Sequence, residues 1–210
     1  MKKINTNGIY YIEAFDGTEE WYWGEDYIHG DLYEAEEIYK KGCEVTSNRL
    51  IFVHYPDGEV KEPILAKKGQ YFGRPFYYEN QIIILLVDFP KQEIKIISYD
   101  TMECKEIVTL PLSIAKDCYN LLLKDYPLML TRQGKENNFE ILWPEKVKFP
   151  MKGWESFDFR RGNKLYFESW DEENDDSDQV VVRDINTGEI IDKMPGSIKP
   201  MPNGQQWLLN

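Results

Sequence analysis

Two stretches of the chain repeat one pattern, and this internal repeat limits the possible folds more than any other feature of the sequence. Residues 99–107 and 183–191 each follow an apolar stretch and contain an aspartate, a short turn and a second apolar stretch. The units end in proline, at Pro111 and Pro195, and both the aspartates and the prolines lie 84 residues apart. Repeats at a fixed spacing are typical of folds that stack one supersecondary unit on the next.

Half of this spacing is close to 42 residues, and a third, more divergent unit fits between the other two at 113–153. A repeat of about 40–45 residues with four strands is typical of a propeller blade. The sequence therefore predicts one all-β domain over 1–210, a small β-propeller of about five four-stranded blades. The expected units are approximately 199–210 plus 1–42, then 43–69, 70–112, 113–153 and 154–198.

The two ends of the chain are expected to share one blade. Residues 202–209 resemble the inner strand of a blade that then stops, and residues 8–12 are apolar enough to begin its remaining strands. Joining the N- and C-terminal segments in this way would close the ring.

Two short motifs carry a resemblance to a known superfamily. Asn203-Gly204-Gln205-Gln206-Trp207-Leu208 and Asp184-Ile185-Asn186-Thr187-Gly188-Glu189 resemble the turn-strand and Asp-x-x-Thr-Gly-x elements of WD40 and YVTN-type propeller repeats. The resemblance covers two units. The chain departs from it at the strand ends, where Tyr99-Asp100 and Arg183-Asp184 replace the Trp-Asp dipeptide. The resemblance implies propeller blades without pointing to one family.

Two segments favour helix and leave another β-rich barrel or an α+β fold open. Asp31 and Glu34 have the spacing of a capping box, and Gly42 is suited to end a helix over 31–41. Residues 113–124 also carry apolar side chains at helical spacing.

Charge and composition limit the partners and the compartment. The formal net charge is -12, which disfavours nucleic acid and anionic membrane surfaces and favours a basic protein as partner, although the charge is also explained by solubility alone. The longest apolar run, 82–87, is too short to cross a bilayer. Three cysteines without CxxC spacing indicate reduced thiols. A cytoplasmic protein is expected.

The sequence contains none of the usual catalytic signatures. HExxH, GxSxG, GxGxxG and the phosphate-binding loop motif are all missing, and the two histidines, His29 and His54, have no metal-ligand spacing around them. No cofactor and no metal are therefore expected, and a non-catalytic protein is favoured.

The densest acidic segment, 171–178, is the main candidate for a binding loop. It resembles a calcium loop, but Asp176 and Val182 stand where an EF-hand needs glycine and glutamate. In a propeller, loops that link second and third strands share one face. The loops expected there are 16–20, 55–58, 88–92, 133–138 and 171–178. The binding residues predicted from this segment are Asp171, Glu173, Asp175 and Asp176.

An aromatic group lies beside the first of these loops. Trp21 and Trp23 are the candidates for stacking on a ligand such as a sugar ring. Because both lie on one side of a predicted strand, packing between blades is the other interpretation.

The function expected from these features is a non-catalytic interaction module whose acidic face binds a basic protein, as an inhibitor or immunity-type protein would. The alternative is a carbohydrate-binding or glycoside-processing propeller, for which Asp158 and Asp117 are the candidate carboxylates. A purely structural scaffold is a third interpretation.

Overall fold

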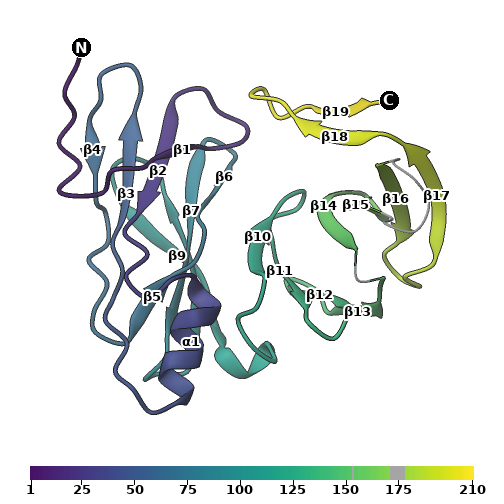
Figure 1. Ribbon diagram of the computed structural model, residues 1–210, viewed down its shortest axis with the longest axis horizontal. Helices are drawn as coiled ribbons and strands as arrows, with labels where there is room; N and C mark the ends of the chain where they lie inside the picture. Colours follow the sequence, from purple (N-terminus) through teal and green to yellow (C-terminus); the bar gives the residue numbers. More distant parts are fainter. Residues whose placement is uncertain (153, 171–177) are drawn as a thin grey trace. The chain divides into compact units, whose positions relative to one another are not determined.

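A computed structural model describes residues 1–152, 154–170 and 178–210 of the chain (Figure 1). The chain divides into two compact units. The first contains residues 1–118 and 202–204, and the second contains residues 119–201 and 205–210. Each unit is built from antiparallel sheets whose strands follow chain order, which is the topology of propeller blades. The described part of the chain is mainly β and propeller-like, with four such sheets of at least four strands.

The first unit holds two sheets and a helix. The first sheet comprises β1 (Glu13–Ala14), β2 (Trp21–Glu25), β3 (Leu50–His54) and β4 (Val60–Lys61). The second comprises β5 (Gln70–Phe72), β7 (Gln81–Asp88), β8 (Glu93–Tyr99) and β9 (Cys104–Pro111), with β6 (Phe76–Tyr78) also paired to β7. Helix α1 (Leu32–Lys40) lies between β2 and β3 in the chain, and a 3-10 turn, η1 (Leu112–Ile114), follows β9.

The second unit holds two further sheets and a hairpin. One sheet comprises β10 (Leu121–Lys124), β11 (Met129–Gly134), β12 (Asn138–Trp143) and β13 (Val147–Pro150). The other comprises β14 (Glu155–Arg161), β15 (Lys164–Ser169), β16 (Gln179–Asp184) and β17 (Ile190–Pro195). The hairpin comprises β18 (Ser197–Pro200) and β19 (Gln206–Leu209).

The hairpin turns off β17 at a glycine. Gly196 has φ +108, and a Cβ at this position would lie 2.0 Å from the carbonyl oxygen of Leu209. Only glycine therefore lets β18 start this close to the end of β19.

The repeat seen in the sequence is confirmed as one kind of turn. Asp100 accepts hydrogen bonds from the backbone N–H groups of residues 102 and 103 between β8 and β9. Asp184 does the same for residues 186 and 187 between β16 and β17. An aspartate that bonds the backbone two and three residues ahead stabilises a tight turn, which explains why the pattern recurs at both places.

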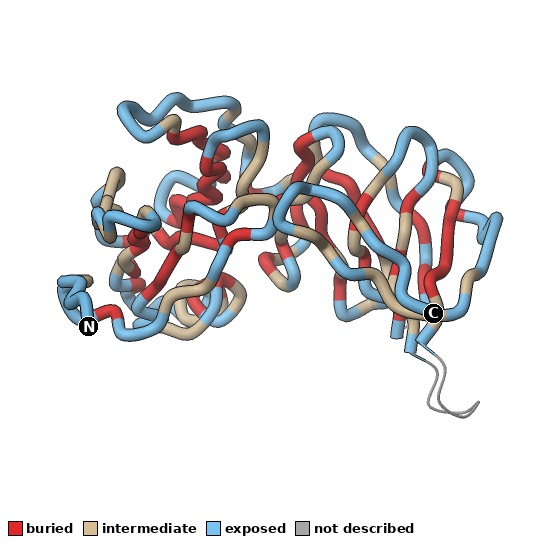
Figure 2. Tube along the Cα trace, turned by 90° about the horizontal axis from the view of Figure 1, so that it is seen from above, coloured by how far each residue is buried: buried red, intermediate tan, exposed pale blue. Residues whose placement is uncertain are grey.

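Each unit has its core between its two sheets. In the first, Phe15, Trp23 and Phe52 of the first sheet pack with Phe72 and Leu86 of the second. Most residues of β3 and β7 are buried. Figure 2 shows buried segments inside the molecule and exposed segments mainly at its turns. Full burial of one such side chain contributes about 1.5–3 kcal/mol, so the contact between the two sheets stabilises both.

Four phenylalanines form the centre of the second core. The ring centroid of Phe139 lies 4.6 Å from that of Phe157 and 5.2 Å from that of Phe167, and Phe149 completes the group at 5.4 Å. These residues come from both sheets of the unit, so the cluster joins them.

A buried ion pair lies beside this cluster. Both guanidinium edge nitrogens of Arg183, Nε and Nη2, lie 2.9 Å from the carboxylate oxygens of Glu155, and its Nη1 donates to the carbonyl of Gly188. Glu155 is 2% exposed and Arg183 is 7% exposed. This bidentate geometry compensates the cost of burying both charges.

Removing one member of the pair is predicted to leave the other charge buried without compensation. Glu155→Ala should lower the free energy of unfolding by about 3–5 kcal/mol, measured by urea denaturation. Glu145→Ala is the control, because Glu145 pairs with Arg160 at the surface and its loss should cost less than about 1 kcal/mol. Equal effects of the two substitutions would contradict this role of the buried pair.

The predicted fifth blade and the closure of the ring are not confirmed. The segment expected to form a separate unit, 43–69, supplies β3 and β4 of the first sheet, where β3 pairs with β2. The C-terminal segment pairs with 197–200 as the β18–β19 hairpin. The sequence of the first sheet does not show the repeat, because β1 and β4 have two residues each and a long connection with a helix separates β2 from β3.

Of the two predicted helices, one is confirmed. Helix α1 begins after the capping box formed by Asp31 and Glu34, as expected for 31–41. The helix over 113–124 is wrong, because the segment contains only the end of η1 and then strand β10, whose residues alternate between buried and half-buried. Within the described residues no helix has the length and apolar character needed to cross a membrane.

Candidate functional site

Acidic residues are concentrated near the start of the chain. Residues 13–44 contain eleven Asp and Glu and two Lys, a net charge of -9, which is three quarters of the formal -12 of the whole protein. This segment includes β1, β2 and α1. The strongest negative field of the described residues therefore originates in the first sheet and its helix.

The connection between β2 and α1, residues 26–31, displays two large apolar side chains. Tyr27 is 47% exposed and Ile28 is 51% exposed. The connection begins at Asp26, whose carboxylate accepts from the backbone N–H of Arg49 at 3.1 Å, and ends at Asp31, the N-cap of α1. Two exposed apolar residues are thus held between two carboxylates.

Hydrogen bonds of the Tyr71 and His29 side chains hold this connection in place. The hydroxyl of Tyr71, a fully buried residue, accepts from the backbone N–H of His29 at 3.1 Å and donates to the carbonyl of Gly30 at 2.8 Å. Burial raises the pKa of Tyr71, so the phenol remains a donor. The Nε2 atom of His29 accepts from the backbone N–H of Thr46 at 2.9 Å. The connection is therefore anchored on both sides of His29.

Tyr27 has a backbone conformation that is unfavourable for its residue type. Its φ is 47°, in the left-handed region, where a bulky L-residue costs about 1–2 kcal/mol relative to glycine. Such conformations persist only where surrounding bonds enforce them, and they cluster at functional positions. Tyr27 is 47% exposed, so part of its ring remains open to a partner.

Helix α1 is held against the second sheet. The ring of Tyr39 stacks on Phe89 with centroids 5.3 Å apart, and the buried carboxylate of Glu36 accepts from the backbone N–H of Cys118 at 2.8 Å. The helix lies beside β5 in the first unit (Figure 1). The end of the 26–31 connection is therefore attached to a fixed element.

Glu25, the last residue of β2, lies under the same connection and is 8% exposed. Its carboxyl accepts from the side-chain nitrogen of Asn48. The same nitrogen donates to the carbonyl of Phe72, and the side-chain oxygen of Asn48 accepts from the backbone N–H of Phe72. Burial raises the pKa of Glu25 to about 8, against the Asn48 hydrogen bond, and the charges of Asp26 and Asp31 add to the rise. At neutral pH this carboxyl is mostly protonated.

These groups are close enough to act as one site. Burial raises the pKa of Tyr27, and the charges of Glu25 and Glu13 raise it further, while Arg74 opposes them. Arg74 bonds Glu13 at 3.3 Å. We call this surface the acidic corner and define it as Glu13, Asp26, Tyr27, Ile28 and Asp31, with Glu25 buried beneath it.

The residues predicted from the sequence lie elsewhere. Trp21 and Trp23 are 8% and 4% exposed and belong to the core between the two sheets of the first unit, with Arg74 over the ring of Trp23. Neither indole presents an open face to a ligand, so the structure favours their packing interpretation. Asp171, Glu173, Asp175 and Asp176 lie outside the described residues.

Two of the loops expected on the shared binding face lie at the other end of the first sheet. Residues 16–20 link β1 to β2, and residues 55–58 link β3 to β4. In an antiparallel sheet both links lie at the end opposite the β2–β3 connection. The second-to-third link of the first sheet is the segment 26–49 that carries the acidic corner, which the sequence analysis missed.

The described residues give little support to metal binding or to glycoside chemistry. In this part of the chain no group of three or more His, Cys, Asp and Glu is arranged to hold a metal ion. His54 bonds Asp57 at 2.8 Å in the β3–β4 turn. Of the two carboxylates considered for glycoside chemistry, Asp117 belongs to the first unit and Asp158 to the second.

Comparison with known proteins adds no family. No protein-family model matches the chain, and no curated protein matches it.

Glu25 is predicted to make stability depend on pH. Between about pH 4.5 and 8 the folded protein retains a proton that the unfolded chain has lost, so the free energy of unfolding falls as pH rises, by at most about 1.4 kcal/mol per unit. Glu25→Gln keeps the acceptor for Asn48 and should flatten this slope, making the variant more stable than the parent at pH 8. Urea denaturation at pH 5, 6.5 and 8 measures the difference.

Glu20→Gln, which removes an exposed carboxylate of the β1–β2 loop, is the control and should keep the parental slope. A Glu25→Gln protein whose slope equals that of the parent would show that Glu25 titrates as an exposed group.

Proposed function

We propose that the protein is a non-catalytic interaction module whose acidic corner binds a basic partner protein, in the manner of an inhibitor or immunity-type protein. The observation that carries the proposal is Tyr27, a half-exposed aromatic residue held in a strained backbone conformation among carboxylates. The three free cysteines, two of them exposed, support a reducing compartment such as the cytoplasm.

Tyrosine is among the residues that contribute most to protein interfaces, because its large ring loses little conformational entropy on binding. At the acidic corner the ring is fixed in advance by the bonds of Tyr71 and His29 to the backbone around it. Fixing a contact residue before binding lowers the entropic cost of association.

The charges around Tyr27 suit a cationic partner. A Lys or Arg side chain over the Tyr27 ring would gain a cation–π interaction while lying close to Asp26 and Asp31. The field of residues 13–44 would accelerate the encounter with a basic protein, and added salt would slow it.

The first test removes charge without removing hydrogen-bond acceptors. The double variant Glu13→Gln/Asp26→Asn should bind a basic partner more weakly by about 1 kcal/mol per charge, roughly fivefold each in Kd. The control, Glu19→Gln/Glu20→Gln, makes the same change in net charge at the opposite end of the sheet. Affinity capture from native lysate with the parent and both variants, quantified by mass spectrometry, provides the comparison.

A basic protein that is recovered with the parent and the control but depleted with the corner variant is the expected result. Equal recovery with both variants would mean that net charge, and not the acidic corner, attracts the partner. The absence of any basic protein would remove the proposal.

A second test separates binding from folding at Tyr27. Tyr27→Gly relieves the left-handed strain, so the free energy of unfolding should not fall by more than about 0.5 kcal/mol. Affinity for the purified partner should fall at least about tenfold, the cost expected for an interface hot spot. Calorimetric titration and urea denaturation measure the two quantities. Unchanged affinity would show that the ring does not contact the partner.

A further inference from the structure

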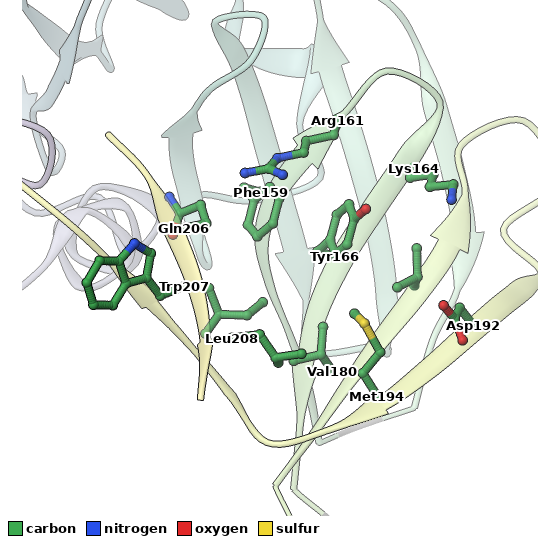
Figure 3. A pocket seen from close by; sticks show the side chains of 12 residues that line it. Phe159, Arg161, Lys164, Tyr166, Val180, Asp192, Met194, Gln206, Trp207 and Leu208 are labelled. Carbon is green, nitrogen blue, oxygen red and sulfur yellow. The ribbon is translucent and has the colours of Figure 1, made fainter. Parts of the chain in front are cut away.

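The second unit contains a cavity of about 250 Å³ whose lining residues come from the sheet β14–β17 and the hairpin β18–β19 (Figure 3). The face of the sheet that lines it is opposite to the core face, because Tyr166 and Val180 line the cavity while their neighbours Phe167 and Val181 lie in the core. None of the lining residues belongs to the acidic corner.

A stacked aromatic pair forms one wall of the cavity. The rings of Phe159 and Tyr166 lie 4.4 Å apart with an interplanar angle of 10°. The guanidinium carbon of Arg161 lies 5.3 Å from the centroid of the Phe159 ring, on the side visible at the top of Figure 3. Val180, which is fully buried, lines the cavity near this pair. A flat apolar surface therefore adjoins a planar cation.

Arg161 differs from the other arginines in its partners. The other five each bond a carboxylate: Arg49 with Glu62, Arg74 with Glu13, Arg132 with Glu136 and Glu140, Arg160 with Glu145, and Arg183 with Glu155. Among the described residues Arg161 has no carboxylate within ion-pair distance. Lys164, its register partner across the β14–β15 hairpin, has none either. In Figure 3 the Arg161 guanidinium lies over Phe159 and the Lys164 amine points away from it, so Arg161 is the cation beside the aromatic pair that is open to an anion.

The hairpin contributes an aromatic side chain to the rim of the cavity. Trp207, which is half exposed, borders the cavity. Gln206 also lines it, but its side-chain oxygen is enclosed by the described residues, so a molecule in the cavity cannot reach it.

The remaining charge of the cavity lies away from Arg161. In Figure 3 Asp192 lies on the side of the cavity away from Arg161. Its Oδ1 accepts from the backbone N–H of Lys193. The volume is slightly below the usual range of ligand pockets, roughly 300–1,000 Å³, so the occupant must be small.

We propose that this cavity binds a small aromatic carboxylate. The carboxylate bonds the Arg161 guanidinium, and the ring packs against the aromatic pair of Phe159 and Tyr166. Guanidinium and carboxylate match each other in planarity and in their paired hydrogen-bonding edges.

The test is a titration of the full chain with 4-hydroxybenzoate, followed by the backbone amide signals of residues 159–166 and 206–208 in NMR spectra. Saturable shifts at these amides are expected. 4-Hydroxybenzamide, which lacks the charge, and cyclohexanecarboxylate, which lacks the aromatic ring, should each bind at least about tenfold more weakly.

Arg161→Gln should weaken 4-hydroxybenzoate at least about tenfold, whereas Lys193→Gln, which removes a neighbouring exposed charge outside the cavity, should leave the affinity unchanged. Tyr166→Leu keeps an apolar side chain and should also weaken binding, which tests the wall if the Arg161 variant fails to fold. Absence of shifts at 10 mM ligand, equal binding of the benzamide, or equal weakening by Lys193→Gln would overturn the proposal.

Discussion

Packing of one sheet face against the next within each unit is the interaction on which the rest of the structure depends. A four-stranded antiparallel sheet can bury its apolar face only if a neighbouring sheet packs a second apolar face against it. Phe52 and Phe72 meet this need in the first unit, and Phe139 and Phe167 meet it in the second. Because these contacts fix the strands, the connections at their ends have rigid attachment points, and a strained residue such as Tyr27 can be held without being buried.

Polar groups inside these cores decide how the sheets meet. Asn48, which is almost fully buried, bonds both backbone groups of Phe72 in the second sheet and the carboxyl of Glu25 in the first. The Glu155–Arg183 pair instead connects β14 to β16 within one sheet of the second unit, across the strand β15 between them. A buried polar group without its partner is costly, so each bond selects one arrangement of the strands. The position of Glu25 beneath the acidic corner follows from this selection.

The sequence was informative where a local interaction specified the structure. The aspartate turns at Asp100 and Asp184 need only residues two and three positions ahead, and the capping box at Asp31 needs only Glu34, so both were predicted. The first sheet was not predicted as one unit, because its pairing of β2 with β3 spans the long segment 26–49. Trp21 was considered for binding because alternation in a strand identifies two faces without showing which one is covered. The clustering of eleven acids in residues 13–44 was visible in the sequence and would have pointed to the acidic corner.

Net charge alone describes this protein poorly, because its two candidate sites have opposite local charge. The basic protein proposed as partner of the acidic corner would be attracted over a long range, and added salt would screen that attraction. The anion proposed for the cavity near Arg161 would have to bind against the repulsion of a chain with a formal charge of -12. Screening weakens that repulsion, while the short contacts inside a cavity are screened much less. Salt would therefore have opposite effects on the long-range part of the two proposed interactions, so a strongly negative net charge is compatible with both.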